Sequence, residues 1–268
     1  MIDYTQRITT LMRDITARVP RLSHVSANDL LVFARYGRSG ADGAFATCHC
    51  VSMPPTDPGY YYWSDRQTGA LTRRSRWFVT KSPHVAVGGR RIRYLISFAL
   101  PRFCDQTLHG APKQRFYAEA PGWLAKLDTI VHELYHIDPQ SAGIRSVERH
   151  DGAPSTRSHG DDFLSTVAGM VREYLESQPD PDAYEFLRFG FTDLEQRYGG
   201  VLATTFRSYP SYPQRYIELV PVSLQPNSAP AVAIEPLKPW AGRTHFTEHD
   251  LVPRQFLEAS TRRAAPRR

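Results

Sequence analysis

The feature that most constrains the fold is an apolar stripe that follows Pro121. Its members recur at the 3.6-residue spacing of an amphipathic helix: Leu124, Leu127, Ile130, Val131 and Leu134. Proline is favoured at the start of a helix, so the helix is predicted to begin near Pro121 and to run to about Ile137. His132, Glu133 and His136 stand inside this stripe. The chain must therefore pack a helix that carries three ionisable side chains near its C-terminal end.

The spacing of these three residues is typical of a metal site. Positions four apart on a helix project from the same face, so His132 and His136 can bind one ion at the roughly 2.0–2.1 Å of zinc–nitrogen bonds. Glu133 then lies beside the ion, where it can act as general base on a water molecule that zinc has made acidic. The pattern predicts zinc-dependent hydrolysis of peptide bonds. The competing interpretation is a helix with two incidental surface histidines.

A catalytic zinc generally keeps three protein ligands and one open position, so a third ligand is expected downstream. We favour His159, because it stands directly before a helix whose start is indicated by Asp161 and Asp162 and which can hold the ring in place. His150 is the second choice. The remaining candidates are Glu148 and Asp151.

Further residues could assist such a site. Asp128, one helical turn before His132, either accepts a hydrogen bond from a ligand imidazole or is a solvated carboxylate on the helix surface. Stabilisation of an oxyanion requires a donor, and the sequence does not choose among the chemically able residues, which are Tyr135, Tyr174, Arg149 and Arg157.

The rest of the chain alternates between short strands and helices. Residues 37–69, rich in Gly, Pro, Ser and Asp, are predicted to be loop or irregular strand. The other predicted elements are helices over residues 4–18, 161–175 and 182–197 and strands over residues 30–33, 77–81, 91–100, 202–206 and 216–222.

The strands over residues 77–81 and 91–100 flank Gly88 and Gly89 and predict a β-hairpin. Apolar residues alternate along the second strand, which predicts a sheet with one face on the core. We expect this strand at the edge of the sheet, where an extended peptide substrate can add alongside it through main-chain hydrogen bonds.

Charge is unevenly distributed along the chain. Residues 61–120 hold 11 basic and 3 acidic side chains, whereas residues 121–200 hold 7 and 14. The basic segment 61–120, with aromatic residues interleaved, makes DNA a possible partner, and the alternative is a sheet whose solvent face is merely basic.

Cysteine content and hydropathy indicate the cellular compartment in which the protein is expected. Cys48, Cys50 and Cys104 are an odd number and predict reduced thiols, and the Cys48-His49-Cys50 run is interpreted as a buried strand because no second pair completes a structural zinc site. The first twenty residues are charged and lack the apolar region of a signal peptide, and no stretch is long enough to span a membrane. A cytoplasmic protein with no membrane partner is expected.

The run His132-Glu133-Leu134-Tyr135-His136, followed by His159-Gly160-Asp161-Asp162-Phe163, resembles the SprT-like zinc peptidases and the related phage-type metallopeptidases. In those families a third histidine lies in a His-Gly-x-x-Phe context. The resemblance implies that His132, His136 and His159 bind Zn²⁺, that Glu133 is the base and that the substrate is a protein or peptide. It covers about residues 120–175. The long interval between His136 and His159 and the missing zinc ribbon favour the phage-type branch.

SprT-like proteins are associated with cleaving proteins attached to DNA, which would suit the basic segment 61–120. Pattern and resemblance together predict an α+β domain of zincin type over residues 1–200, with a mainly antiparallel sheet packed on the metal helix. A Pro-rich extension with short strands and a basic tail is expected over residues 201–268. Two rival functions stay open: a zinc hydrolase of non-peptide amides, and a non-catalytic module that binds DNA or protein and holds zinc as structure.

Overall fold

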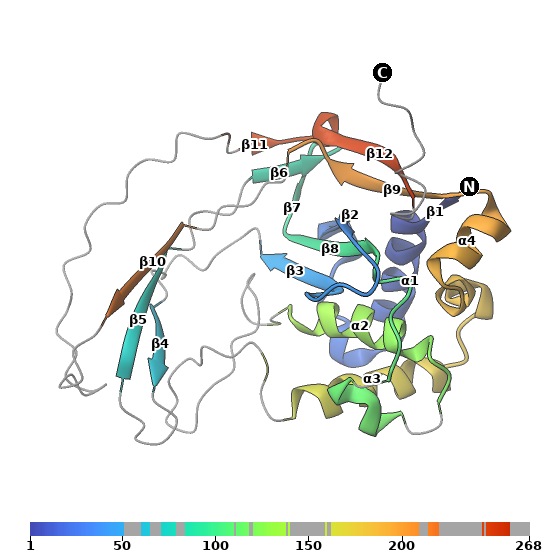
Figure 1. The fold of residues 1–268 in the computed structure, drawn as a ribbon, viewed down its shortest axis with the longest axis horizontal. Helices are drawn as coiled ribbons and strands as arrows, with labels where there is room; N and C mark the ends of the chain where they lie inside the picture. The colour runs from blue at the N-terminus through green and yellow to red at the C-terminus, as the bar shows by residue number, and fades with distance from the viewer. Residues whose placement is uncertain are drawn as a thin grey trace.

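A computed structural model of the chain describes most of the first 137 residues and separate stretches after them (Figure 1). Side chains are not described for Cys50 or for the strands over residues 60–64, 71–78 and 214–219. The described residues are 1–50, 60–64, 71–78, 84–109, 111–117, 120–137, 139, 159, 162–208, 214–219, 243 and 245–257.

The first helix, α1, spans Tyr4–Arg18 and confirms the predicted element. Asp3 is its N-cap, accepting a hydrogen bond from the backbone N–H of Gln6 at 2.9 Å, and the helix ends at Val19 before Pro20. Its apolar stripe is fully buried and consists of Ile8, Leu11, Met12 and Ile15.

The central sheet contains β2 (Leu30–Gly37), β8 (Tyr94–Pro101) and β3 (Ala46–Cys50), in the order β2-β8-β3. β2 pairs with β8 in parallel and β3 pairs with β8 in antiparallel orientation, so this sheet is mixed rather than mainly antiparallel. Every residue of β8 is buried. Alternate side chains of β8 therefore enter two different cores, one on each face of the sheet.

Both expectations for the strand over residues 91–100 were wrong. The stretch divides at the exposed Arg93 into β7 (Arg90–Ile92) and β8. β8 lies in the middle of its sheet, so its main chain is already paired on both sides and cannot accept a peptide. The second face is buried because Leu95 packs with Phe33 and Phe206, the last of which comes from more than 100 residues further along the chain.

The predicted turn is confirmed, but its first strand was misplaced. Gly88 and Gly89 adopt φ values of 57° and 74° and connect β6 (His84–Val87) to β7. These positive values suit glycine because it lacks a Cβ atom. Residues 71–78 instead form β5 (Leu71–Phe78), which pairs with β4 (Tyr60–Ser64) and β10 (Gln214–Leu219) in an antiparallel sheet.

The metal helix of the sequence analysis is α2, which spans Leu124–Tyr135, and the next helix is α3, Phe163–Glu176. Ten of the twelve residues of α2 are buried. Figure 1 shows α1, α2 and α3 on one side of the central sheet, while β6, β9, β11 and β12 lie toward its other side. The helix that carries the histidines is thus enclosed by the sheet and by neighbouring helices.

The predicted helix over residues 182–197 is broken into shorter elements. They are two 3₁₀ turns, η4 (Pro181–Ala183) and η5 (Glu185–Arg188), and the helix α4 (Phe191–Tyr198). Gly190 is extended at the N-terminus of α4, and Asp105 accepts the Phe191 N–H there at 2.8 Å. A distant carboxylate therefore starts a new helix where the sequence suggested a continuous one.

The described part of residues 201–268 shares sheets with the N-terminal half of the chain. β9 (Val201–Phe206) pairs in parallel with β1 (Ile2–Asp3) and in antiparallel orientation with β12 (Leu251–Phe256). β11 (His245–Phe246) pairs with β6. Remaining 3₁₀ turns are η1 (Pro20–Leu22), η2 (Ala27–Asp29), η3 (Pro112–Phe116) and η7 (Glu248–Asp250).

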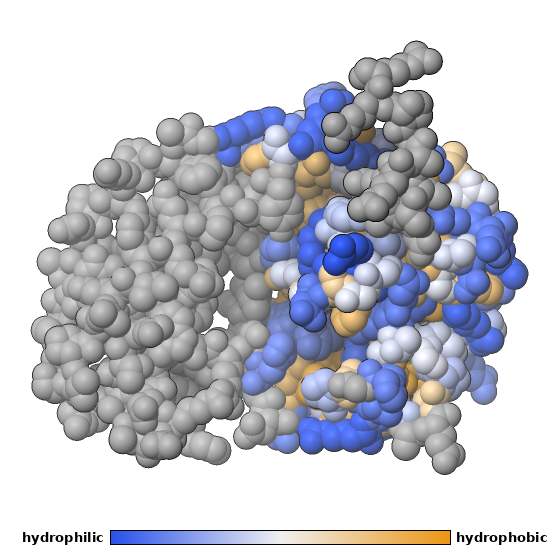
Figure 2. All heavy atoms as spheres, in the orientation of Figure 1, coloured by the Kyte–Doolittle hydropathy of each residue, from blue (hydrophilic) through white to orange (hydrophobic). Residues whose placement is uncertain are grey.

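The described residues form an α+β structure with four three-stranded sheets, of which three are mixed and one is antiparallel. On the face drawn in Figure 2, hydrophilic residues cover most of the described surface and apolar residues form small patches between them. Within the described part, no helix has both the length and the apolar character needed to cross a bilayer.

Candidate metal centre

Helix α2 brings two imidazoles to one place at its C-terminal end. His132 and His136 lie one turn apart, with ring centroids 4.8 Å from each other. His132 is half-buried and His136 is buried. The apolar stripe of α2 is packed against the core, which fixes the rotation of the helix and therefore the face on which both rings stand.

The third imidazole comes from the segment before α3. The His159 Nε2 atom lies 3.0 Å from His132 Nε2 and 3.2 Å from His136 Nε2. The ring of His159 is exposed, so the cluster reaches solvent on that side. The structure thus brings together all three residues that the sequence analysis assigned as metal ligands.

The geometry fits a tetrahedral metal ion. Ligand nitrogens at about 2.0–2.1 Å from a tetrahedral zinc ion lie roughly 3.3 Å apart, close to the two separations found here. One ring nitrogen of each histidine lies within 4.8 Å of the others, and this is the only such group of His, Cys, Asp or Glu among the described residues. These three histidines would hold the ion and would leave one position of a four-coordinate zinc for water or substrate. The donor set suits zinc, and imidazole also binds copper, iron and nickel.

Burial favours the neutral form of His132 and His159, which is the form that binds metal. The pKa of His132 is well below its usual value because of burial, with further lowering by the neighbouring His136 and His159. Burial also lowers the pKa of His159. A proton and a metal ion compete for the same nitrogen, so this environment favours the ion.

Phe163 forms an apolar wall beside the cluster. Its buried ring has centroid separations of 4.9 Å from His132, 5.0 Å from His136 and 4.6 Å from His159. Tyr135 contacts the same ring at 5.0 Å. The first residue of α3 therefore holds the three imidazoles in position, a contact that the sequence analysis did not assign to it.

Glu133 is oriented by the central sheet. The residue is 5% exposed, and its carboxylate accepts a hydrogen bond from the backbone N–H of Cys48 in β3. Burial raises the pKa of Glu133 to about 7, although the Cys48 N–H and the positive charges of Lys113 and Arg35 oppose the increase. β3 contains the Cys48-His49-Cys50 run that was interpreted as a buried strand, but the sequence did not indicate that a backbone N–H of this strand holds Glu133.

Asp128 matches neither of the two roles considered for it. Its side chain is fully buried; Oδ1 accepts from Lys113 Nζ at 2.9 Å and Oδ2 accepts from the Tyr117 hydroxyl at 2.7 Å. The Lys113 ammonium also donates to Ala125 O at 2.8 Å and to Thr129 Oγ1 at 2.7 Å. Asp128 therefore ties α2 to η3 and to the residue that follows it.

The candidates for oxyanion stabilisation have different positions. Tyr174 donates from its hydroxyl to Asp14 in α1 at 2.7 Å, so its hydroxyl is used in joining α3 to α1. Tyr135 is half-buried next to Phe163 and remains a candidate. The other residues named for oxyanion stabilisation or as alternative ligands lie outside the described residues: Arg149, Arg157, His150, Glu148 and Asp151.

Only some of the basic side chains described in the segment 61–120 are exposed. Lys113 is mostly buried against Asp128, and the buried Arg102 donates to the carbonyl oxygens of Arg38 and Asp42. Other arginines of the segment are exposed, namely Arg90, Arg91, Arg93 and Arg115. DNA binding through this segment stays a prediction.

The Cys48-His49-Cys50 run does not form a metal site with its first two side chains. Cys48 is buried in the core that contains α2, whereas His49 points to the other face, where its ring is 6.1 Å from Phe33. Adjacent residues of a strand point to opposite faces, so these two cannot bind one ion.

His49 makes a pH-dependent contribution to stability. Its Nε2 lies 3.0 Å from Ser97 Oγ, and burial, with a smaller effect of Arg35, lowers its pKa to about 4. In the unfolded chain His49 binds a proton near pH 6.5. In the folded chain it binds this proton only near pH 4. The contribution of His49 is therefore fully present above pH 6.5 and is lost as the pH falls through this window.

We expect His49→Gln to reduce the pH dependence of the free energy of unfolding between about pH 6.5 and 4. One proton corresponds to a slope of about 1.4 kcal/mol per pH unit, which is the largest change the variant can produce. Urea unfolding of both proteins at a series of pH values measures the difference, and the histidine cluster is common to both. Identical slopes would show that His49 titrates normally in the folded protein.

Comparison with protein-family models, curated proteins and solved structures finds no match to this chain. The resemblance to SprT-like and phage-type metallopeptidases therefore stays a prediction that depends on the motif residues. The arrangement of the three imidazoles and Glu133 is an independent observation on the same residues.

Proposed function

We propose that the chain is a zinc-dependent metallopeptidase whose ligands are His132, His136 and His159 and whose general base is Glu133. The observation that carries this proposal is the convergence of three imidazole nitrogens, with His159 Nε2 at 3.0 and 3.2 Å from the other two, beside a buried carboxylate on the same helix. The enclosing sheet and helices are compatible with the zincin type of architecture.

The proposed roles follow from position. Zinc, when bound, supplies a Lewis acid that makes water acidic near neutral pH and polarises a carbonyl group. Glu133 is the next residue after a ligand and is held by the Cys48 N–H, so its second oxygen can accept the proton of the attacking water. The same carboxylic acid then returns this proton to the departing amine. Phe163 excludes water from one side of the imidazoles.

Exposure of His159 favours a large substrate over a small one. Among the described residues the His159 ring is exposed, so an extended polypeptide can reach the cluster from solvent at this residue. A protein or peptide in an unfolded conformation is therefore the proposed substrate.

Metal removal tests the proposal. The protein loaded with zinc should contain one ion per chain and cleave an unfolded protein; a chelator should abolish cleavage and added zinc should restore it. His159→Ala should lose both the ion and the activity. His109→Ala, a change at an exposed histidine outside the cluster, is the matched control and should keep both.

The outcomes separate the rival functions. Zinc binding with cleavage of small acyl anilides but not of unfolded protein would indicate an amide hydrolase. Zinc binding with a higher melting temperature and no hydrolysis of either substrate would indicate a structural metal. Failure of the wild-type protein to bind any divalent ion would contradict the metal centre itself.

A further inference from the structure

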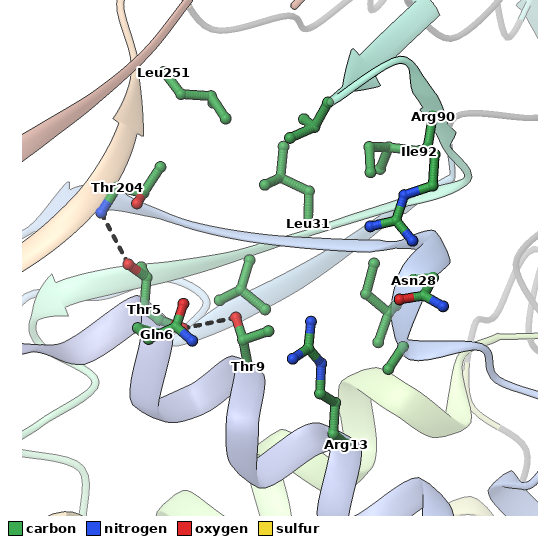
Figure 3. A pocket seen from close by; sticks show the side chains of 14 residues that line it. Thr5, Gln6, Thr9, Arg13, Asn28, Leu31, Arg90, Ile92, Thr204 and Leu251 are labelled. Carbon is green, nitrogen blue, oxygen red and sulfur yellow. Dashed lines mark hydrogen bonds between the residues drawn. The ribbon is translucent and has the colours of Figure 1, made fainter. Parts of the chain in front are cut away.

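A cavity lies between α1 and the β6–β7 hairpin (Figure 3). It has a volume of about 260 Å³ and is lined by residues of α1, η2, the central sheet, the β6–β7 hairpin and the C-terminal strands. None of the residues lining it belongs to the proposed metal centre. Figure 3 shows α1 as the floor and the hairpin above it.

Two arginines give the cavity a positive charge. Arg13 rises from α1 and Arg90 descends from β7, and Figure 3 shows both guanidinium groups directed into the space between the two elements. No Asp or Glu is among the lining residues. Within the described part of the chain, neither guanidinium group has a hydrogen bond or an ion pair. The two charges are therefore available to a ligand and are not neutralised by the cavity wall.

The hydroxyl groups of Thr5 and Thr9 are already engaged. Thr5 donates to Asp3 Oδ1 and accepts from the Thr204 N–H, both at 2.9 Å, and Thr9 donates to the Thr5 carbonyl oxygen at 2.8 Å. These bonds fix the polar wall of the cavity without offering a donor to a ligand. Donors to a ligand are thus the two guanidinium groups, the Thr204 hydroxyl and the exposed amides of Gln6 and Asn28.

The opposite wall is apolar. Leu31, Val87 and Leu251 are partly buried there, and Ile92 is buried beneath them. Together with Phe33 and Phe206 they belong to the second core, on the face of the sheet away from α2. A ligand seated between the arginines would bury part of its own apolar surface on these side chains.

We propose that this cavity binds a small organic anion: an oxyanion group between Arg13 and Arg90, joined to an apolar body that lies on Leu31, Val87 and Leu251. Arginine donates in a planar fork that matches both carboxylate and phosphate, so the two chemistries share this recognition. The site is independent of the proposed peptidase activity and requires no metal.

Isothermal titration with three ligands of equal chain length tests the inference. Hexanoate and hexyl phosphate distinguish a carboxylate from a phosphate, and hexylamine carries the opposite charge. At least one of the two anions should bind, and hexylamine should not. Arg13→Gln and Arg90→Gln should each weaken the binding about tenfold or more, because each removes a charged hydrogen bond.

Matched controls come from the same two elements. Arg7 in α1 and Arg91 in β7 are exposed but do not line the cavity, so Arg7→Gln and Arg91→Gln should leave the affinity unchanged. His132→Ala should also bind the anion normally, which separates this site from the metal centre. Absence of binding by both anions at millimolar concentration would overturn the proposal. Equal weakening by the controls, or binding of hexylamine, would do the same.

Discussion

Glu133→Gln should reduce hydrolysis of an unfolded protein by about 10²- to 10⁴-fold, the range that general-base catalysis contributes. Glutamine has nearly the same shape as glutamate but cannot accept the proton of the attacking water. The three imidazoles are untouched, so the zinc content should remain one ion per chain. Initial rates at saturating substrate, measured beside metal analysis of the same samples, give both quantities.

The stability of this variant distinguishes a catalytic role from a structural one. Glu133 is 5% exposed, and removing a charge from a buried position relieves its desolvation, so the melting temperature should not fall. Glu176→Gln, the same chemical change at an exposed position of α3, is the control and should retain full activity. Retained activity in Glu133→Gln, or loss of zinc together with activity, would contradict the assignment of Glu133 as base.

The chelating helix could be predicted because its information is local. His132 and His136 share a face by helical spacing alone, and the apolar stripe from Leu124 to Leu134 determines which face is buried. The assignment of His159 as the third ligand required one more inference. We had to assume that the residue before the next helix lies close to His132 and His136. The structure confirms this convergence at 3.0 and 3.2 Å.

The sheet could not be predicted to the same degree, because its pairing is not local. β8 alternates like a strand with one solvent face, yet Phe206 of β9 covers that face from beyond residue 200. β3 consists of Ala-Thr-Cys-His-Cys, in which Thr47 is the only one of the β-branched, Phe, Tyr or Trp residues that favour strands. Its importance for Glu133 depends on a backbone N–H, which any residue at Cys48 would supply.

The ion pair between Lys113 and Asp128 could not be predicted from the sequence, for a different reason. Lys113 stands in a segment whose excess of basic residues suggests a solvated or nucleic-acid-binding face, and a short 3₁₀ turn has no apolar periodicity to show which side chain points inward. Burial of this lysine is possible only because Asp128, Ala125 and Thr129 lie together on one side of α2. The residues next to Lys113 in the sequence do not indicate that these three residues of α2 lie close to its side chain.

Lys113→Met should lower the free energy of unfolding by about 3–5 kcal/mol, the usual effect of removing one partner of a buried ion pair. The two side chains are 11% and 1% exposed, and burial lowers the pKa of Lys113 while Asp128 opposes this change. Without the ammonium group, the Asp128 carboxylate would keep only the Tyr117 hydroxyl at 2.7 Å. Arg115→Met, an exposed neighbour in η3, should lower stability by less than about 1 kcal/mol.

The double variant Lys113→Met/Asp128→Asn tests the cause of the loss. Asparagine carries no charge and can still accept a hydrogen bond from Tyr117, so the double variant should be more stable than Lys113→Met alone. Urea unfolding of the four proteins in the cycle gives the coupling energy. Additive effects of the two changes would show that the ion pair does not stabilise the protein. Strong coupling would show that the ion pair between η3 and α2, one turn before His132, stabilises the packing of the helix that carries the metal ligands.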